Sequence, residues 1–423
     1  MRDPVDAPAP TEPRPLARVL ADARLADGRR VDVHVVGGVI TQVTSPGEHR
    51  RADAEVDNLD GFLLLPALAE PHAHVDKALT AAHVPNATGD LLGAIDGWIT
   101  ASMQGRFTHD DIVARSTRAM ELLVLNGVTA VRSHVNVGAE IGTEYLRAVR
   151  EARRCFDGIL DVHLVALTAS PMTGPDGAGN RAALREALEM GVDVVGGCPH
   201  LDPDGASAIA DAIAVATEAG LGLDLHTDET LDPDVLELRE LARQVIDTGF
   251  EGPVTASHCV SLGMQPVDVQ QAVAREVAEA GISVVTLPQT NLFLQGRGHP
   301  TATPRGLTAI AALRDAGVTV VAGADNVQDP FNLMGRSDPL ETAALLVMAG
   351  HLLPDDAYTM VSNSVRSIMG LPEVHVRPGD PADLLAIRSP SVRGAIADAP
   401  HDRVVYRGGR AVARSESTRA ILR

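Results

Sequence analysis

Pro71-His72-Ala73-His74-Val75-Asp76-Lys77 follows, after two residues, an apolar run from Phe62 to Leu68. The run has the composition of a buried β-strand, and successive side chains of a strand alternate between its two faces. We therefore expect His72 and His74 to point the same way, about 6–7 Å apart, where two imidazoles can bind one metal ion. Two histidines alone are weak evidence, so the rest of the chain must show whether they belong to a site.

Short β-branched runs alternate with amphipathic helical stretches between Gly61 and Leu371, the pattern of β/α units around a parallel sheet. The expected strands end at His74, Val135, Leu167, Val195, His226, His258, Leu287 and Asp325. The expected helices span residues 110–125, 144–154, 181–190, 206–219, 234–248, 267–280, 307–316 and 338–351. Eight such units predict an α/β fold of the (β/α)8 TIM-barrel type, with its active site at the C-terminal ends of the strands.

Both ends of the chain have a different pattern. Apolar and polar residues alternate from residue 17 to 44 and again near residues 382–412, around the turn dipeptides Asp27-Gly28 and Gly408-Gly409. We predict a small β-sandwich built from residues 17–60 and 375–423, a barrel domain over residues 61–374, and a disordered N-terminal segment over residues 1–16.

The charge balance limits the partners of the protein. The chain has 36 Lys and Arg residues against 56 Asp and Glu residues, which gives a net charge of −20, and it has no basic stripe. We therefore expect neither nucleic acid nor a membrane surface as a partner. The first residues lack the apolar core of a signal peptide, and no apolar run reaches the roughly 18 residues of a membrane span. We expect a cytoplasmic homo-oligomer acting on a small molecule. Its three cysteines form no C-x-x-C pair, which favours free thiols.

Metal-binding residue types fall at the expected strand ends. His72, His74, His226 and Asp325 offer three imidazoles and one carboxylate at the mouth of the barrel. With no thiolate among them, this set favours Zn²⁺ or Fe²⁺ over copper(I), and Ca²⁺ would need more oxygen ligands. Such an ion lowers the pKa of bound water toward about 7, and Asp325 could both bind the ion and accept the water proton. For His134 and His200, at the same rim, we favour hydrogen bonding or packing over metal binding.

Two further residues are candidates for acid–base chemistry. Glu229 lies three residues beyond His226 on the loop that leaves the fifth strand, where it can move protons to a ring nitrogen and a leaving amine. The alternative for Glu229 is an acid in the first turn of a helix. His258 ends the sixth strand and could donate to the developing tetrahedral centre.

The residues as a set resemble the amidohydrolase superfamily, and within it the cytosine deaminase-like branch. The similar motifs are residues 70–77, 131–135, 194–196, 199–200, 226–229, 254–258, 294–297, 379–384 and 406–410, so the resemblance covers nearly the whole chain after about residue 17. It implies a distorted barrel flanked by a sandwich, and hydrolysis of a carbon–nitrogen bond at a ring amidine or amide. It also implies metal ligands at His72, His74, His226 and Asp325, a proton shuttle at Glu229, and support of the attacking oxygen by His258.

One ion per chain is expected. Binuclear barrels of this superfamily commonly bridge two ions with a carbamylated lysine at the end of strand four, and residues 192–197 contain none. Lys77 is the only lysine of the chain and lies on a different loop, and a bridge through Cys198 is the remaining, weaker alternative.

The departures from cytosine deaminases concern the substrate. The chain has Ala324-Asp325-Asn326 where His-Asp-Asp is usual, Asn136 where an aspartate is usual, and Thr168-Ala169-Ser170-Pro171 where a glutamine reads the pyrimidine. A site that loses such a polar partner changes its substrate strongly, so cytosine itself is doubtful. Lys77 is the leading candidate for a substrate contact, and the weaker candidates are Asn291, Gln295, Arg297 and Asp338.

Three readings of the function remain. The first is a mononuclear deaminase of an amino-substituted N-heterocycle that releases ammonia. The second is hydrolysis of an N-substituted amino-heterocycle or a cyclic amide, which releases an amine or opens a ring. The third is a non-catalytic metal-binding barrel.

Overall fold

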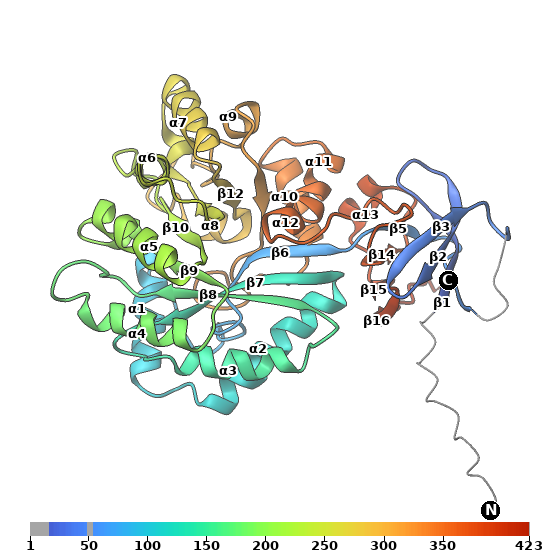
Figure 1. Cartoon of the computed structure of the whole chain (residues 1–423), viewed down its shortest axis with the longest axis horizontal. Helices are drawn as coiled ribbons and strands as arrows, with labels where there is room; N and C mark the ends of the chain where they lie inside the picture. Colours follow the sequence, from blue (N-terminus) through green and yellow to red (C-terminus); the bar gives the residue numbers. More distant parts are fainter. Residues whose placement is uncertain (1–16, 49–53, 423) are drawn as a thin grey trace, which may run out of the picture.

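A parallel eight-stranded sheet closes into a barrel in the computed structural model, which describes residues 17–48 and 54–422 (Figure 1). Its strands are β6 (Leu68–Ala73), β7 (Val128–Val137), β8 (Asp161–Thr168), β9 (Val194–Gly197), β10 (Gly222–Thr227), β11 (Val254–His258), β12 (Ser283–Thr286) and β13 (Val320–Ala322). They follow one another around the sheet in chain order, and a parallel bridge between Ala73 and Asp325 brings the last strand end to the first. The predicted barrel is confirmed.

All eight expected helices are present around the barrel. They are α2 (His109–Leu125), α3 (Glu144–Arg154), α4 (Ala178–Glu189), α5 (Gly205–Ala219), α6 (Glu237–Thr248), α7 (Val267–Glu279), α9 (Ile310–Asp315) and α10 (Pro339–Met348). Local chemistry sets their ends: the Thr108 side chain accepts from Asp111 N at the start of α2, and Gly220, at φ +66°, ends α5. Because α6 begins only at Glu237, Glu229 lies on a loop and is not a helix first-turn acid.

Within the described residues there are five further α-helices that were not expected from the sequence. They are α1 (Leu91–Met103), α8 (Pro288–Leu294), α11 (Pro354–Thr359), α12 (Asn363–Ile368) and α13 (Val392–Asp398). The first of them matters for function, because α1 is inserted between β6 and α2. Asp90 caps it by accepting a 2.9 Å hydrogen bond from Gly93 N.

A second sheet joins the two ends of the chain. Its strands are β1 (Ala17–Arg24), β2 (Arg30–Val36), β3 (Val39–Thr44), β4 (Glu55–Asn58), β5 (Leu63–Pro66), β14 (Leu384–Ile387), β15 (Arg403–Arg407) and β16 (Arg410–Ser415). Figure 1 shows this sheet, blue and red, beside the barrel. The predicted pairing of the two ends is therefore confirmed, while residues 1–16 lie outside the described residues.

The apolar run from Phe62 to Leu68 is not one strand, as the sequence suggested. Its first half is β5, which pairs antiparallel with β14 in the terminal sheet, and its second half begins β6 of the barrel. Proline lacks an N–H for a ladder bond, and the division falls at Pro66-Ala67. This short stretch therefore links the two sheets and carries the chain directly into His72.

Candidate active site

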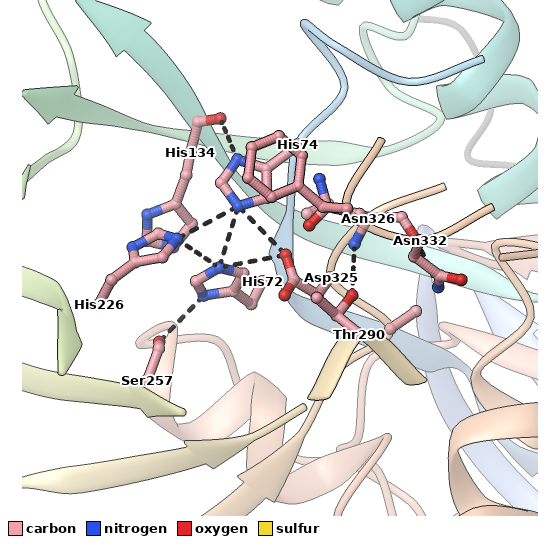
Figure 2. Close-up of polar contacts among 12 residues, drawn as sticks. His72, His74, His134, His226, Ser257, Thr290, Asp325, Asn326 and Asn332 are labelled. Atoms are coloured by element: carbon pink, nitrogen blue, oxygen red, sulfur yellow. Dashed lines mark hydrogen bonds and ion pairs between the residues drawn. The ribbon is translucent and has the colours of Figure 1, made fainter. Parts of the chain in front are cut away.

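Four side chains converge at the C-terminal mouth of the barrel (Figure 2). The Nε2 atoms of His72, His74 and His226 lie 3.2–3.3 Å from one another. Asp325 Oδ1 lies 3.1 Å from His74 Nε2 and 3.7 Å from His72 Nε2. All four side chains are buried, and the structure thus brings together the four residues that the sequence nominated as metal ligands.

The donor atoms of this cluster fit a metal ion better than they fit one another. The Nδ1–H groups of His72 and His74 donate to Ser257 Oγ at 2.9 Å and to His134 O at 3.2 Å, so both Nε2 atoms present lone pairs to the cluster. Burial, together with neighbouring histidines and Lys77, lowers the pKa of His72 and of His226 well below the usual range, which keeps both imidazoles neutral. Ligand atoms 2.0–2.1 Å from a tetrahedral ion are about 3.3–3.4 Å apart, close to the separations here.

A chain of hydrogen bonds leads from His72 into the barrel interior. Ser257 accepts from His72 Nδ1 and donates to Asp224 Oδ1 at 3.0 Å, and Asp224 Oδ2 accepts from Arg132 Nη1 at 2.7 Å. All of these side chains are buried, and burial raises the pKa of Asp224 to about 6 although Arg132 opposes the shift. This relay, His72–Ser257–Asp224–Arg132, fixes the tautomer in which His72 Nε2 is free, the usual arrangement of histidines that bind metals.

Unusual backbone conformations occur at two of the functional strand ends. His258 has φ +71° and Asp325 has φ +65°, in the left-handed region that non-glycine residues rarely adopt. The buried Glu70 carboxylate accepts from the backbone N–H groups of Ala324 and His72, which joins the end of β6 to the segment after β13. Such strained positions cluster at functional sites, where the surrounding structure holds them.

His258 and Glu229 lie beside the cluster. His258 Nδ1 is 3.1 Å from Asn291 Oδ1 and 3.6 Å from Glu229 Oε1, and its Nε2 is 3.9 Å from Asp325 Oδ2. Burial and the nearby Asp325 carboxylate raise the pKa of Glu229 well above the usual range, against the opposing effect of Lys77. A buried carboxyl with a raised pKa can both donate and accept a proton near neutral pH.

Lys77 lies in the same cavity, only 4% exposed. Its Nζ is 4.9 Å from the ring centre of Phe331 and 5.9 Å from that of Trp98. Both polar neighbours of the Asn136 amide are donors, so its oxygen faces them and accepts from Lys77 Nζ at 3.1 Å and from Trp98 Nε1 at 3.2 Å. In the described part of the chain no carboxylate oxygen lies within 4 Å of this ammonium group, which leaves donors for a substrate oxygen.

The weaker substrate candidates are not among the described residues that line the cavity. Asp338 caps α10 and pairs with Arg403 at 2.7 Å. Asn291 contacts His258, and Gln295 donates from Nε2 to Glu229 O at 3.0 Å, so both support neighbouring catalytic candidates. Arg297 stacks on Phe293, 4.7 Å from its ring centre, and donates to Phe293 O.

The remaining histidines and Cys198 have separate surroundings. His134 stacks on His72 with 3.9 Å between ring centres, and one grouping of possible ligand atoms, His72, His134 and His226, includes it. His200 donates from Nδ1 to His226 O at 3.0 Å. Burial raises the pKa of Cys198 to about 12, which keeps this thiol protonated, and the groupings of possible ligand atoms among the described residues do not include it.

A cavity of about 580 Å³ opens in front of these groups. The residues on its wall that carry chemistry are His74, Lys77, His226, Glu229, His258 and Asp325. The cavity therefore combines acid–base groups, a candidate metal cluster and one ammonium group in a single space.

Comparisons with known proteins identify the family to which this protein belongs. The sequence pattern of the amidohydrolase family matches residues 86–416, and the chain belongs to this family. A pterin deaminase of Rhizobium rhizogenes strain K84 is 32% identical over 395 residues, which cover 91% of this chain and 88% of that protein. The crystal structure of a 5-methylcytosine deaminase from Klebsiella pneumoniae liganded with 5-fluorocytosine has a TM-score of 0.85 at 26% identity, with 96% of this chain and 99% of that chain covered.

A further relative is named for a different activity. The N-isopropylammelide isopropyl amidohydrolase of Pseudomonas sp. strain ADP is 24% identical over 415 residues, 94% of this chain and 97% of that protein.

These findings confirm the predicted class: the protein is a metal-dependent hydrolase that acts on carbon–nitrogen bonds other than peptide bonds, of the type that deaminates N-heterocycles. The reading as a non-catalytic barrel finds no support in them. No helix within residues 17–48 and 54–422 is both long and apolar enough to cross a membrane.

Proposed function

We propose that the enzyme deaminates a fused, amino-substituted N-heterocycle of the pterin type and releases ammonia. The observation that carries this proposal is the single 580 Å³ cavity in which Glu229, His258 and Lys77 face the histidine cluster. Such a cavity accommodates a bicyclic ring together with the groups that would act on it. The 32% identity to a pterin deaminase over most of both chains supports the same substrate class.

The metal ligands in this proposal are His72, His74, His226 and Asp325. Their donor atoms lie 3.1–3.7 Å apart in the contacts named above, and the hydrogen bonds of His72 and His74 leave both Nε2 atoms free. A Zn²⁺ or Fe²⁺ ion, one per chain, would supply Lewis-acid activation of water there. The choice between the two metals is not fixed by this donor set, because both accept imidazole and carboxylate.

Glu229 moves the protons of the reaction. Water adds to the ring amidine carbon, the adjacent ring nitrogen takes a proton from the Glu229 carboxyl, and the carboxylate takes a proton from the added oxygen. Glu229 then delivers this proton to the exocyclic nitrogen, which leaves as ammonia. The Glu229 carboxylate takes the remaining proton of the added oxygen as the ring carbonyl forms, which returns Glu229 to its starting carboxyl form. The burial that raises the pKa of Glu229 suits a group that must give up and regain a proton twice per turnover.

His258 and Lys77 bind oxygen atoms in this scheme. Asn291 Oδ1 accepts from His258 Nδ1–H, which leaves a lone pair on His258 Nε2, 3.9 Å from Asp325 Oδ2. His258 Nε2 can therefore accept a hydrogen bond from the O–H of the attacking water. Lys77 donates to a ring carbonyl, which replaces the contact that a glutamine makes in the cytosine deaminases that this chain resembles. The stacking of Phe331 against the Lys77 ammonium holds it in this direction.

A second candidate is hydrolysis of an N-substituted amino-heterocycle with release of an amine. The relative named N-isopropylammelide isopropyl amidohydrolase, matched over 94% of this chain, favours it. The chemistry differs only in the leaving nitrogen, because Glu229 would protonate an alkylamine in place of ammonia.

The test is product analysis with purified, Zn²⁺- or Fe²⁺-loaded enzyme on pterin, cytosine, an aminotriazine and N-isopropylammelide. We expect ammonia from pterin and the fastest turnover with this substrate. Glu229→Gln is the matched inactive control, since it keeps the shape and loses the proton transfer. Amine release from the N-alkyl substrate alone would favour the second candidate, and no hydrolysis of any heterocycle by fully loaded enzyme would refute both. The cytoplasmic location and the homo-oligomeric state stay predictions.

A further inference from the structure

The cavity is larger than a bare ring requires. Its 580 Å³ lies in the middle of the range of about 300–1,000 Å³ that holds drug-sized ligands. The reactive groups come from the ends of β6, β10, β11 and β13. The rest of the wall comes mostly from the segments that follow β7, β8 and β9, together with the inserted helix α1.

Helix α1 presents an apolar face to this additional space. The lining residues Leu91, Leu92, Ile95, Trp98 and Ile99 recur at the spacing of one helical face. Leu92 is 69% exposed and Ile99 is 37% exposed, so these side chains lack the cover that the core gives to Trp98. Ile141 and Leu201 add apolar surface from the segments after β7 and β9.

The charged groups of this outer wall are all acidic. Glu140 and Asp176 line the cavity and are exposed, and Lys77, beside the reactive groups, is the only lysine or arginine among the described lining residues. A ligand group that carries a negative charge would therefore meet two like charges there.

We propose that the outer wall, defined by Leu91, Leu92, Ile95, Ile99, Glu140 and Asp176, is a subsite for an uncharged, partly apolar substituent on the substrate ring. This inference rests on the proposed function, because the ring must occupy the space before Glu229 and Lys77 for its substituent to reach α1. The natural substrate is then a ring-substituted aminopteridine, and the substituent contributes to binding through α1.

Steady-state kinetics test this subsite with pterin, its 6-propyl and 7-propyl derivatives, and the two corresponding pterin propionates. The propyl group of one isomer should raise kcat/KM at least about tenfold over pterin, as expected for several methylene groups in an apolar pocket. The propionate of the same isomer should lose this gain. Equal kcat/KM for pterin and both propyl isomers would overturn the inference.

Variants on α1 separate the subsite from a general effect on the enzyme. Leu92→Asp and Ile99→Asp should reduce the preference for propylpterin over pterin at least about tenfold. Met103→Asp is the matched control, because Met103 lies on the same helix, is 66% exposed and does not line the cavity. A fall in preference with Met103→Asp equal to that with Leu92→Asp would also overturn the inference.

A binding measurement makes the test independent of turnover. Dissociation constants of pterin and the propylpterins are measured by fluorescence on Glu229→Gln, which is expected to bind without reacting. If these compounds bind with the propyl preference but the wild type does not hydrolyse them, the proposed function fails and the subsite stands. If pterin is deaminated but no propyl preference exists in either assay, the subsite fails and the proposed function stands.

Discussion

Ser257→Ala should weaken metal binding without removing a ligand. The Ser257 hydroxyl is buried and accepts from His72 Nδ1 at 2.9 Å, and the substitution leaves this N–H without a partner. In the metal-free variant, His72 can carry its proton on Nε2 instead of Nδ1, so that no buried N–H is left without a partner. With a metal on Nε2 the proton must stay on Nδ1, so the cost of one buried, unpaired donor, about 1–3 kcal/mol, falls on the metal-bound state. This cost corresponds to a metal affinity about 5- to 150-fold lower.

Competition with a chromophoric chelator at fixed pH measures the Zn²⁺ dissociation constant of the two proteins. Thermal unfolding of the metal-free proteins separates the effect on folding, since Asp224 also loses the donor at 3.0 Å. Ser261→Ala is the matched control, because its buried hydroxyl has no hydrogen-bond partner in the described part of the chain. A Ser257→Ala affinity within twofold of the wild type, or an equal loss in Ser261→Ala, would refute the tautomer argument.

Three other predictions concern single groups, and each has its own measurement. Glu229→Gln should lower kcat about 10²- to 10⁴-fold while the metal content stays at one ion per chain, by elemental analysis; two ions per chain would contradict the mononuclear site. Lys77→Met should raise KM for a carbonyl-bearing heterocycle by at least about tenfold and Lys77→Arg should restore little of it, since the fork of arginine does not replace a point charge; kinetics with KM unchanged would remove Lys77 from substrate binding. Burial lowers the pKa of His200 to about 4. The unfolded chain therefore takes up a proton at this histidine at a higher pH than the folded chain does, and the free energy of unfolding falls as the pH drops below 6.5. His200→Gln should abolish about 1.6 kcal/mol of this loss between pH 6.5 and 5 in denaturant unfolding, and identical pH profiles would disprove it.

The cluster at the barrel mouth could be predicted because it depends on strand ends. Each candidate ligand follows a short apolar run, and the C-terminal ends of parallel strands in a barrel meet at one mouth wherever they lie in the sequence. His226 and Asp325 could thus be placed near His72 without knowledge of any side-chain direction. Glu229 could be placed on the loop by its distance from the strand end.

The relay behind His72 could not be predicted in this way. Arg132, Asp224 and Ser257 come from three strands, and their contacts depend on which side chains meet across the interior of the closed barrel. The sequence pattern gives the face of a strand but not the pairing across the barrel. The available indication was one charged residue inside each of two expected buried strands, Arg132 and Asp224.

Helix α1 was missed for a different reason. Its N-cap at Asp90 and its apolar spacing are both present in the sequence, but the segment lies between a strand and the expected helix of the same β/α unit. The regular alternation of the barrel has no place for it. The prediction from residue type also put Arg297 at the substrate, whereas its guanidinium stacks on Phe293 outside the cavity lining.

The single lysine of this chain has a consequence for chemical labelling. Arginine supplies every other basic side chain, so Lys77 is the only side-chain amine that an acylating reagent or a reductive alkylation could modify. At 4% exposure it is also shielded from large reagents by Phe331 and Trp98. Small amine-reactive probes that fit the cavity would therefore report occupancy of the active site directly, as one modified side chain per protein molecule.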